Sequence, residues 1–141
     1  MKFLLATDGS EHARRAARYL ASHVAEFSKP PQIFLISVHP PIPFPGAAAA
    51  VGKKAVEDYQ REECEKALKV AEEEFDKAGL RYQSSWLVGE VAAEVERHAQ
   101  KVGADLVVIG SHGRSAFLSM ALGSNAAKIL ALVKLPVLIV R

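Results

Sequence analysis

The residues best suited to chemistry lie between Gly110 and Asn125, where two glycine-rich segments flank a loop. Residues 107–109 form a β-branched apolar run that predicts a buried strand, and the run stops at the turn Gly110-Ser111-His112-Gly113. A turn of this kind lets backbone N–H groups approach an anion closely. Gly123-Ser124 then precedes a helical pattern, and a helix start presents free N–H groups at the positive end of the helix dipole. Together the two segments predict a binding site for phosphate groups.

Each segment alone is more typical of a tight turn or an ordinary helix N-cap with no ligand. The spacing Gly-x2-Gly-x9-Gly-Ser, placed between a strand and a helix, is what favours a ligand. Asn125 either caps this helix or supplies one more backbone N–H to the terminal phosphates.

Asp8 is the one carboxylate that we expect at a strand end. It either caps the following helix, with Glu11 three residues on, or accepts hydrogen bonds from a ribose or an adenine amino group. His112 has no carboxylate nearby in the sequence to orient it, which favours a phosphate contact or solvent exposure over general acid–base catalysis. Arg114 is either a charged contact to a polyphosphate or a surface arginine.

The elements that must position these residues alternate between strand and helix. Strand patterns cover residues 2–7, 32–38, 81–88, 107–109 and 136–140, and helical patterns cover 13–27, 56–78, 91–102 and 126–133. The connections are long enough for right-handed crossovers, which predicts an α/β fold with an open five-stranded parallel sheet and helices on both faces. One side of the strand pattern at 81–88 is polar, which is typical of an edge strand.

Two further segments carry specific expectations. Residues 39–53 hold four of the seven prolines and a run of four alanines, which favours a mobile connection, with a lid over a ligand as the alternative. Arg14, Arg15 and Arg18 share one side of the first helical pattern and are expected to form a solvated face.

Composition predicts one domain over residues 1–141 and excludes several classes of protein. The net charge of +2, without a basic cluster, predicts no nucleic-acid partner. Lys134 and Pro136 interrupt the apolar C-terminal stretch, and Asp8 ends the first apolar run early, so we expect neither a membrane span nor a signal peptide. Cys64 is the single cysteine, so no internal disulfide can form, which fits a cytoplasmic protein. In its helical pattern we expect a core or groove thiol.

The whole chain resembles the universal stress protein (UspA) family, in the subset whose Gly-x2-Gly-x9-Gly-Ser/Thr loop binds ATP. The motif residues are Gly110, Gly113, Gly123 and Ser124, and the segments ATDGS, GADLVVIGSHGR and LPVLIVR add to the resemblance. It implies a Rossmann-like, adenine nucleotide alpha hydrolase-like sheet in the order 3-2-1-4-5. Strands 1 and 4 then meet at the topological switch point, where open α/β sheets bind ligands.

The resemblance also implies an ATP site. Ala6, Thr7 and Asp8 would line its adenosine end, and the backbone of Val38 would contact adenine. The full set of expected binding residues is Ala6, Thr7, Asp8, Val38, Ile109, Gly110, His112, Gly113, Arg114, Gly123, Ser124 and Asn125. Relatives carry a small apolar residue in place of Asn125, which puts a role for its side chain in question, but not one for its backbone. Any Mg²⁺ or Mn²⁺ would be held through the phosphates, since no cluster of side chains has metal-ligand spacing.

By this resemblance the chain is an ATP-binding regulatory module of the stress response, and not an enzyme. The apolar strand at 136–141 is an exposed edge that predicts a homodimer. Two alternatives stay open. The same pocket could serve a slow ATPase or phosphotransferase, or the chain could be a nucleotide-free dimeric interaction module.

Overall fold

The computed structural model describes residues 1–43, 45–114 and 122–141. Strands and helices alternate along the chain, except that two helices follow one another after the second strand and that one short 3-10 helix comes after the first helix. The elements are β1 (Lys2–Ala6), α1 (Glu11–His23), η1 (Val24–Glu26), β2 (Gln32–His39), α2 (Pro45–Val51), α3 (Lys53–Lys77), β3 (Tyr82–Val88), α4 (Val91–Val102), β4 (Leu106–Gly110), α5 (Ser124–Leu132) and β5 (Val137–Val140).

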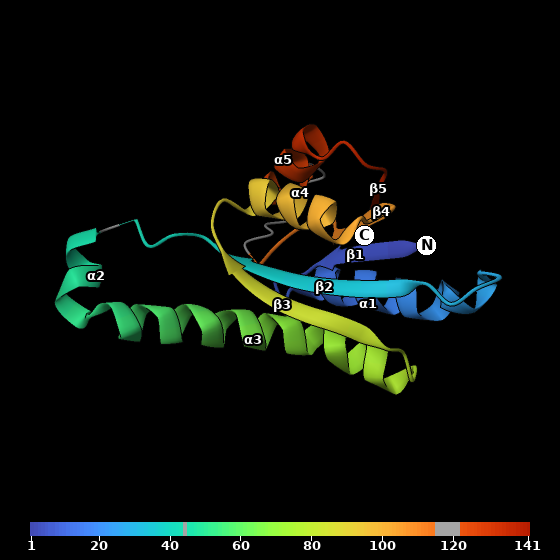
Figure 1. Ribbon diagram of the computed structural model, residues 1–141, viewed down its shortest axis with the longest axis horizontal. Coiled ribbons are helices and arrows are strands. Elements are labelled where there is room, and N and C mark those ends of the chain that lie inside the picture. Colours follow the sequence, from blue (N-terminus) through green and yellow to red (C-terminus); the bar gives the residue numbers. More distant parts are fainter. Residues whose placement is uncertain (44, 115–121) are drawn as a thin grey trace.

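The five strands form one parallel sheet in the order β3-β2-β1-β4-β5, which confirms the expected fold and the edge position of β3. β1 lies between β2 and β4, and its last residue, Ala6, pairs with Ile36 on one side and Ile109 on the other (Figure 1). Phe3, Leu4 and Leu5 are fully buried, as expected of a central parallel strand that is covered on both faces.

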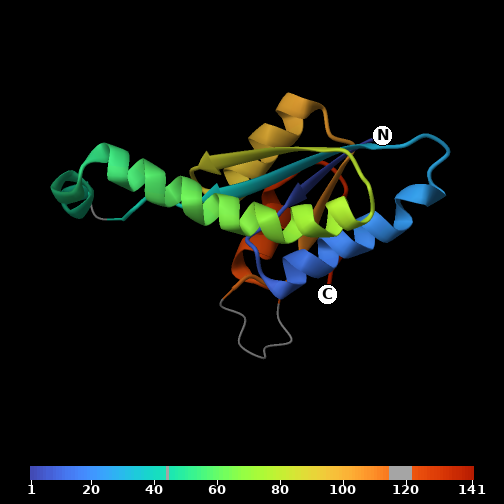
Figure 2. The same ribbon diagram turned by 90° about the horizontal axis from the view of Figure 1, so that it is seen from below.

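α1 and α3 cover one face of the sheet, and α4 and α5 cover the other (Figure 2). Successive side chains of a strand point to opposite faces, so Phe3 and Leu5 pack toward α1 and α3, whereas Leu4 packs toward α4 and α5. Ala16 and Ala17 of α1 are fully buried, and their small side chains let the helix lie close to the strands. The sheet therefore has one apolar core on each side.

Local capping fixes where α1 and α4 begin, just beyond the carboxyl ends of β1 and β3. The Ser10 hydroxyl accepts the Ala13 N–H at 3.2 Å, and the Glu90 carboxylate accepts the Ala93 N–H at 2.8 Å. A side chain that accepts a free N–H of the first turn stabilises a helix start by about 1 kcal/mol. Both helix starts are thereby held near the carboxyl ends of the strands.

The expectation of an irregular connection over residues 39–53 is wrong for its second half. Pro45–Val51 form α2, and α3 begins at Lys53, three residues before the expected start of the long helix at Val56. Alanine is the strongest helix former, and a proline suits the first helical position, so the alanine run outweighs the breaking effect of the prolines. Gly52 separates the two helices at φ +90°, a backbone conformation that favours glycine.

α2 and the first turns of α3 project beyond the sheet (Figure 1). α3 is 25 residues long but strongly charged. Among the described residues, no helix combines the length and the apolarity that crossing a membrane requires.

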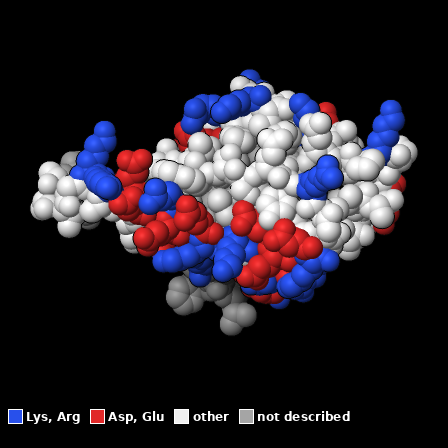
Figure 3. Space-filling view, turned by 60° about the horizontal axis from the view of Figure 1, so that its bottom comes forward, with Lys and Arg blue, Asp and Glu red and all other residues white. Residues whose placement is uncertain are grey.

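The expectation of a solvated arginine face on α1 is confirmed for Arg15 and Arg18, which are exposed, whereas Arg14 is only partly exposed and packs against α3. Glu74 of α3 is only 7% exposed, and it accepts hydrogen bonds from Arg14 Nη1 at 3.2 Å and Arg18 Nε at 3.1 Å. Acidic and basic side chains are interleaved where the two helices meet (Figure 3). The hydrogen bond from Arg18, with that from Arg14, lowers the pKa of Glu74 from its ordinary value of 4.5 to about 2.

We expect Glu74→Gln to lower the free energy of unfolding at pH 7 by about 1–2 kcal/mol, less than a fully buried ion pair, because Arg18 is exposed to solvent and screened. A lowered carboxyl pKa stabilises the folded state above the unfolded-state pKa, and this contribution is lost as the pH falls toward the folded-state value. The difference between Glu74→Gln and the parent should therefore shrink between pH 4.5 and about 2. Urea denaturation across this range measures it.

Glu73→Gln is the matched control, since Glu73 is 43% exposed and, among the described residues, forms its single ion pair with Arg14 at 3.3 Å. It should change the free energy of unfolding by no more than about 0.5 kcal/mol. Equal effects of the two substitutions would show that the burial of Glu74 adds nothing to its contribution to the free energy of unfolding.

Candidate functional site

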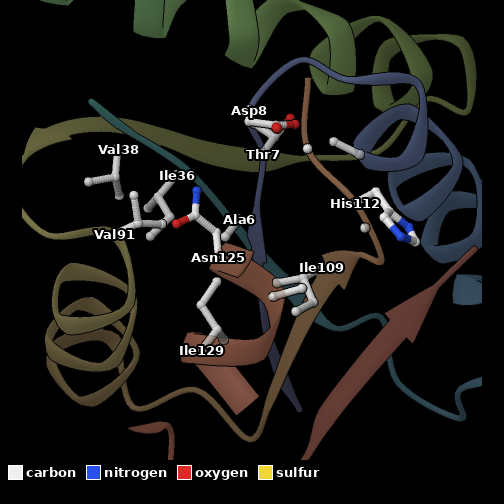
Figure 4. A pocket seen from close by; sticks show the side chains of 14 residues that line it. Ala6, Thr7, Asp8, Ile36, Val38, Val91, Ile109, His112, Asn125 and Ile129 are labelled. Carbon is white, nitrogen blue, oxygen red and sulfur yellow. The ribbon is translucent and has the colours of Figure 1, made fainter. Parts of the chain in front are cut away.

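A cleft opens at the carboxyl ends of β1, β2 and β4 (Figure 4). The chain leaves β1 toward α1 on one face of the sheet and leaves β4 toward α5 on the other, so the cleft lies at the topological switch point. The residues that line the cleft are Ala6, Thr7, Asp8, Ala13, Ile36, Val38, Val91, Ile109, Gly110, His112, Gly113, Asn125, Ala126 and Ile129.

The cleft has an apolar part and a polar part. Ile36, Val91 and Ile129 surround the apolar part, whereas Asp8 lies at the opposite side near Thr7 (Figure 4). The Asn125 carboxamide points between them, toward the middle of the cavity (Figure 4). An apolar recess with a few convergent polar groups is the usual form of a small-molecule site.

Asp8 is held by backbone amides on both carboxylate oxygens. Its Oδ1 accepts the Ser10 N–H at 2.9 Å and its Oδ2 accepts the Arg114 N–H at 3.2 Å. The N-cap of α1 is Ser10, so the alternative in which Asp8 caps this helix is wrong. Asp8 instead orders the turn after β1 and faces the cleft.

Packing within the chain itself leaves little room for a side chain at three glycines of the motif. A Cβ on Gly110 would lie 2.6 Å from the His12 carbonyl carbon, one on Gly113 would lie 2.7 Å from Asp8 Oδ2, and one on Gly123 would lie 3.1 Å from the Ser111 oxygen. The first contact is with backbone, so position 110 requires glycine, whereas a side chain at position 113 would displace the Asp8 carboxylate. Substituting these glycines would therefore disturb the fold as well as any ligand.

A hydrogen bond brings the two ends of the glycine motif together. The Gly123 N–H donates to the Ser111 carbonyl at 2.9 Å, and the Ser10 hydroxyl donates to the His112 carbonyl at 3.2 Å. The start of α5, the turn after β4 and the start of α1 therefore meet at one place. Residues 115–121, inside the x9 segment of the motif, lie outside the described residues.

The His112 ring lies against α1. Its centroid is 5.1 Å from that of His12, its Nδ1 is 3.0 Å from the Ser111 hydroxyl, and it points away from the cavity (Figure 4). The backbone of His112, more than its ring, therefore borders the cleft. This orientation gives no support to acid–base catalysis by the imidazole.

Arg114 lies in an adjoining hollow between Asp8 and α3, which Tyr59, Glu63 and Cys64 also line. Its Nε donates to the Asp8 carbonyl at 2.6 Å, and its Nη1 is 3.4 Å from Glu63 Oε2. Cys64 is 2% exposed, which confirms the expected core or groove thiol, and burial raises its pKa.

Nine of the twelve expected binding residues line the cleft, Arg114 lines the adjoining hollow, and Gly123 and Ser124 stand at the start of α5. Sequence reasoning missed the apolar residues that complete the cavity, which are Ala13, Ile36, Val91, Ala126 and Ile129. Val91 carried a usable signal, since it opens a helix directly after the Gly89-Glu90 turn. Within the part of the chain that the structure describes, no group of three or more His, Cys, Asp or Glu side chains could hold a metal ion.

Comparison with known proteins gives a consistent result. The model of the universal stress protein family matches residues 1–141. A universal stress protein encoded in the QAH/OAS sulfhydrylase 3' region of Thermus aquaticus is 31% identical over 139 residues, covering 98% of this chain and 96% of the relative. Universal stress protein MJ0531 of Methanocaldococcus jannaschii is 29% identical over 140 residues, covering 99% of this chain and 81% of the relative.

Solved structures share the fold. Hypothetical protein MJ0577 superposes with a TM-score of 0.81 at 23% identity, covering 99% of this chain and 94% of its own. The Archaeoglobus fulgidus universal stress protein in complex with dAMP gives 0.64 at 22% identity, with 100% and 98% covered. A universal stress protein family protein of Arabidopsis thaliana with AMP bound gives 0.66 at 15% identity, with 99% and 90% covered.

Proposed function

Because this chain belongs to the universal stress protein family, we propose that it binds adenine nucleotides, ATP among them, in the cleft at the carboxyl ends of β1, β2 and β4. The observation that carries the proposal is the meeting of three features at one place. These are an apolar recess, a fixed carboxylate at Asp8, and the glycine-rich turn beside the start of α5. Two relatives of the same fold were solved with dAMP and with AMP, which supports an adenine nucleotide as the ligand class.

The backbone of β2 can recognise the adenine base. The Thr7 N–H donates to the Ile36 carbonyl, and the Gly89 N–H donates to the His39 carbonyl, so alternate residues of β2 direct their backbone groups toward β1 and β3. This alternation directs the N–H and carbonyl of Val38 toward β1. The ladder between β1 and β2 ends at the pair Ala6–Ile36, so Val38 lies beyond its last rung and faces the cleft. A donor and an acceptor side by side match the hydrogen-bonding edge of adenine.

The start of α5 can bind the phosphates. The first N–H groups of a helix lack intrahelical partners and lie at the positive end of its dipole, where anions are stabilised. The Gly123 N–H is bound to the Ser111 carbonyl, so within the described part of the chain the amides of Ser124, Asn125 and Ala126 are left for a ligand. Any Mg²⁺ or Mn²⁺ would be held by the nucleotide's own phosphates.

We propose a binding and regulatory role in the stress response, and not efficient turnover. Hydrolysis of ATP needs a group that orients or deprotonates the attacking water. Asp8 accepts two backbone N–H groups, and the His112 ring points away from the cavity. Steady production of ADP at a rate abolished by Asp8→Ala would favour the ATPase alternative.

Narrowing the cleft beside the base should prevent binding without touching the glycine motif. Val91 lines both the cleft and the adjoining hollow, so we expect Val91→Phe to weaken ATP and AMP binding by more than about tenfold, because the larger ring fills the space for adenine. Calorimetric titration of the purified protein with each nucleotide measures the affinity.

Val88→Phe is the matched control, since Val88 ends β3, is 38% exposed and does not line the cleft. Its affinity should stay within about twofold of the parent, as is usual for a surface substitution away from the site. Absence of nucleotide binding by the folded parent protein would refute the proposal and favour the nucleotide-free module.

We also propose that the chain forms a homodimer through β5. β5 is an edge of the sheet, its four residues are half-buried, and Leu130 and Leu132 of the adjacent α5 are exposed. The Val107 N–H donates to the Pro136 carbonyl and the Ser111 N–H donates to the Val140 carbonyl, so the backbone groups of Ile139, between these positions, point away from β4. A second copy can pair with these outward groups.

Ile139→Pro should therefore abolish the dimer while the monomer stays folded. Proline removes the outward N–H of Ile139 but none of the hydrogen bonds between β4 and β5, and proline is tolerated in an edge strand at such a position. Sedimentation velocity at micromolar concentration, with circular dichroism to monitor folding, measures the result. A monomeric parent protein, or an unchanged dimer in the variant, would contradict this interface.

A further inference from the structure

Asp8 and Arg114 bind each other twice, across 106 positions of sequence. The Arg114 N–H donates to Asp8 Oδ2 at 3.2 Å, and the Arg114 guanidinium donates from Nε to the Asp8 carbonyl at 2.6 Å. Arg114 thus binds both the side chain and the backbone of Asp8. The contact joins the turn after β1 to the loop after β4.

The Asp8 carboxylate is constrained from two further directions. The Ser10 N–H binds its Oδ1 at 2.9 Å, and its Oδ2 lies so close to Gly113 that a Cβ there would be 2.7 Å away. A carboxylate offers about four acceptor positions, and the two amides occupy two of them. Asp8 therefore keeps acceptor capacity for a ligand while its orientation is fixed.

The guanidinium of Arg114 is directed toward α3. Its Nη1 lies 3.4 Å from Glu63, which Lys66 also holds at 2.9 Å. The pKa of Glu63 is lowered by Lys66 and, to a smaller extent, by Arg114. Asp8 lines both the cleft and the adjoining hollow, whereas Arg114 lines the hollow alone.

We propose that Arg114 is a positioning residue whose side chain, by binding the Asp8 carbonyl, fixes the turn that holds the Asp8 carboxylate in the orientation needed to recognise ribose hydroxyls. It would thereby set the selectivity of the site for the sugar, and not its affinity for the phosphates. The inference rests on the proposed function, because it assumes that the sugar of a bound nucleotide lies at Asp8.

The contacts of Arg114 require a guanidinium and not merely a positively charged side chain. Nε donates from a planar guanidinium whose other end is held by Glu63, and a lysine ammonium cannot reproduce this two-ended contact. A site that binds a ribose hydroxyl discriminates against a deoxy analogue only while the acceptor of that hydroxyl, here the Asp8 carboxylate, is held in place. Loss of a group that orients a binding residue typically costs 10- to 100-fold.

The test compares two ratios of dissociation constants in the parent protein, Arg114→Gln and Arg114→Lys. The sugar ratio is the dissociation constant of 2'-deoxy-AMP or 3'-deoxy-AMP divided by that of AMP. The phosphate ratio is the dissociation constant of AMP divided by that of ATP. In both variants we expect the sugar ratio to fall by about tenfold toward one, with the phosphate ratio unchanged within about twofold. The exposed α3 residue Arg61, which pairs with Asp58, gives the control Arg61→Gln, in which both ratios should match the parent.

Each other outcome overturns the inference. If Arg114 contacts phosphate, Arg114→Gln changes the phosphate ratio and Arg114→Lys restores it, while the sugar ratio stays constant. A parent protein that binds none of these nucleotides would remove the proposed function itself. Nucleotide binding with an unchanged sugar ratio in the variants removes only the role of Arg114.

Glu63→Gln keeps the test independent of the folding of the Arg114 variants, since it leaves Arg114 in place and removes the charge that anchors the far end of the guanidinium, together with the exposed ion pair to Lys66. It should lower the sugar ratio by about two- to fivefold, in keeping with the small contribution of an exposed ion pair. Thermal melts of all variants identify any loss of folded protein. An unchanged sugar ratio in well-folded Glu63→Gln and Arg114→Lys proteins would refute the inference.

Discussion

The site depends on the point at which β1 ends between its two neighbours. β1 pairs with β2 and β4 only as far as Ala6, whereas β2 continues to His39. The space beyond Ala6 exposes the backbone of Val38, and the chain that leaves β1 places Asp8 at its rim. The helices leave β1 and β4 on opposite faces, so neither fills this space. A sheet in which β1 and β4 were not neighbours would have no such cleft.

The same constraint explains the glycines of the motif. The turn after β4 must pass close to the start of α1 and to Asp8, and Gly110 and Gly113 occupy the points of closest approach. These glycines therefore serve packing and ligand access together. The ion pairs of Glu74 are separate from the site, since they join α1 to α3 outside the cleft. Stability and binding should accordingly respond to different substitutions.

Much of this could be predicted from the sequence. Apolar runs bounded by turn residues mark the five strands, and the glycine spacing marks the polar end of the cleft. The strand order came from the family resemblance, because periodicity says nothing of which strands are neighbours. The helix at Pro45–Val51 is hard to predict from the sequence, because nearby prolines indicate a helix break whereas the alanine run indicates a helix.

Long-range contacts were beyond sequence reasoning. The pairing of Arg114 with Asp8 and Glu63, and of Arg18 with Glu74, joins residues at least 51 positions apart, and no local pattern marks such partners. The apolar wall of the cleft is composed of ordinary core residues such as Ile36 and Ile129. Their role becomes visible only when the ends of β2 and α5 are seen to face each other.

A second hollow on the protein surface serves as an internal control for nucleotide binding in the cleft. It lies at the amino ends of β2 and β3 and is lined by residues that include Phe27, Leu80 and Tyr82. A titration of ¹⁵N-labelled protein with AMP, followed by amide chemical shifts, reports on both places at once. We expect the largest shifts at Val38, Gly113 and Asn125, which border the cleft, with little change at Leu80 and Tyr82. Shifts confined to the second hollow, or no shifts at millimolar AMP, would contradict it.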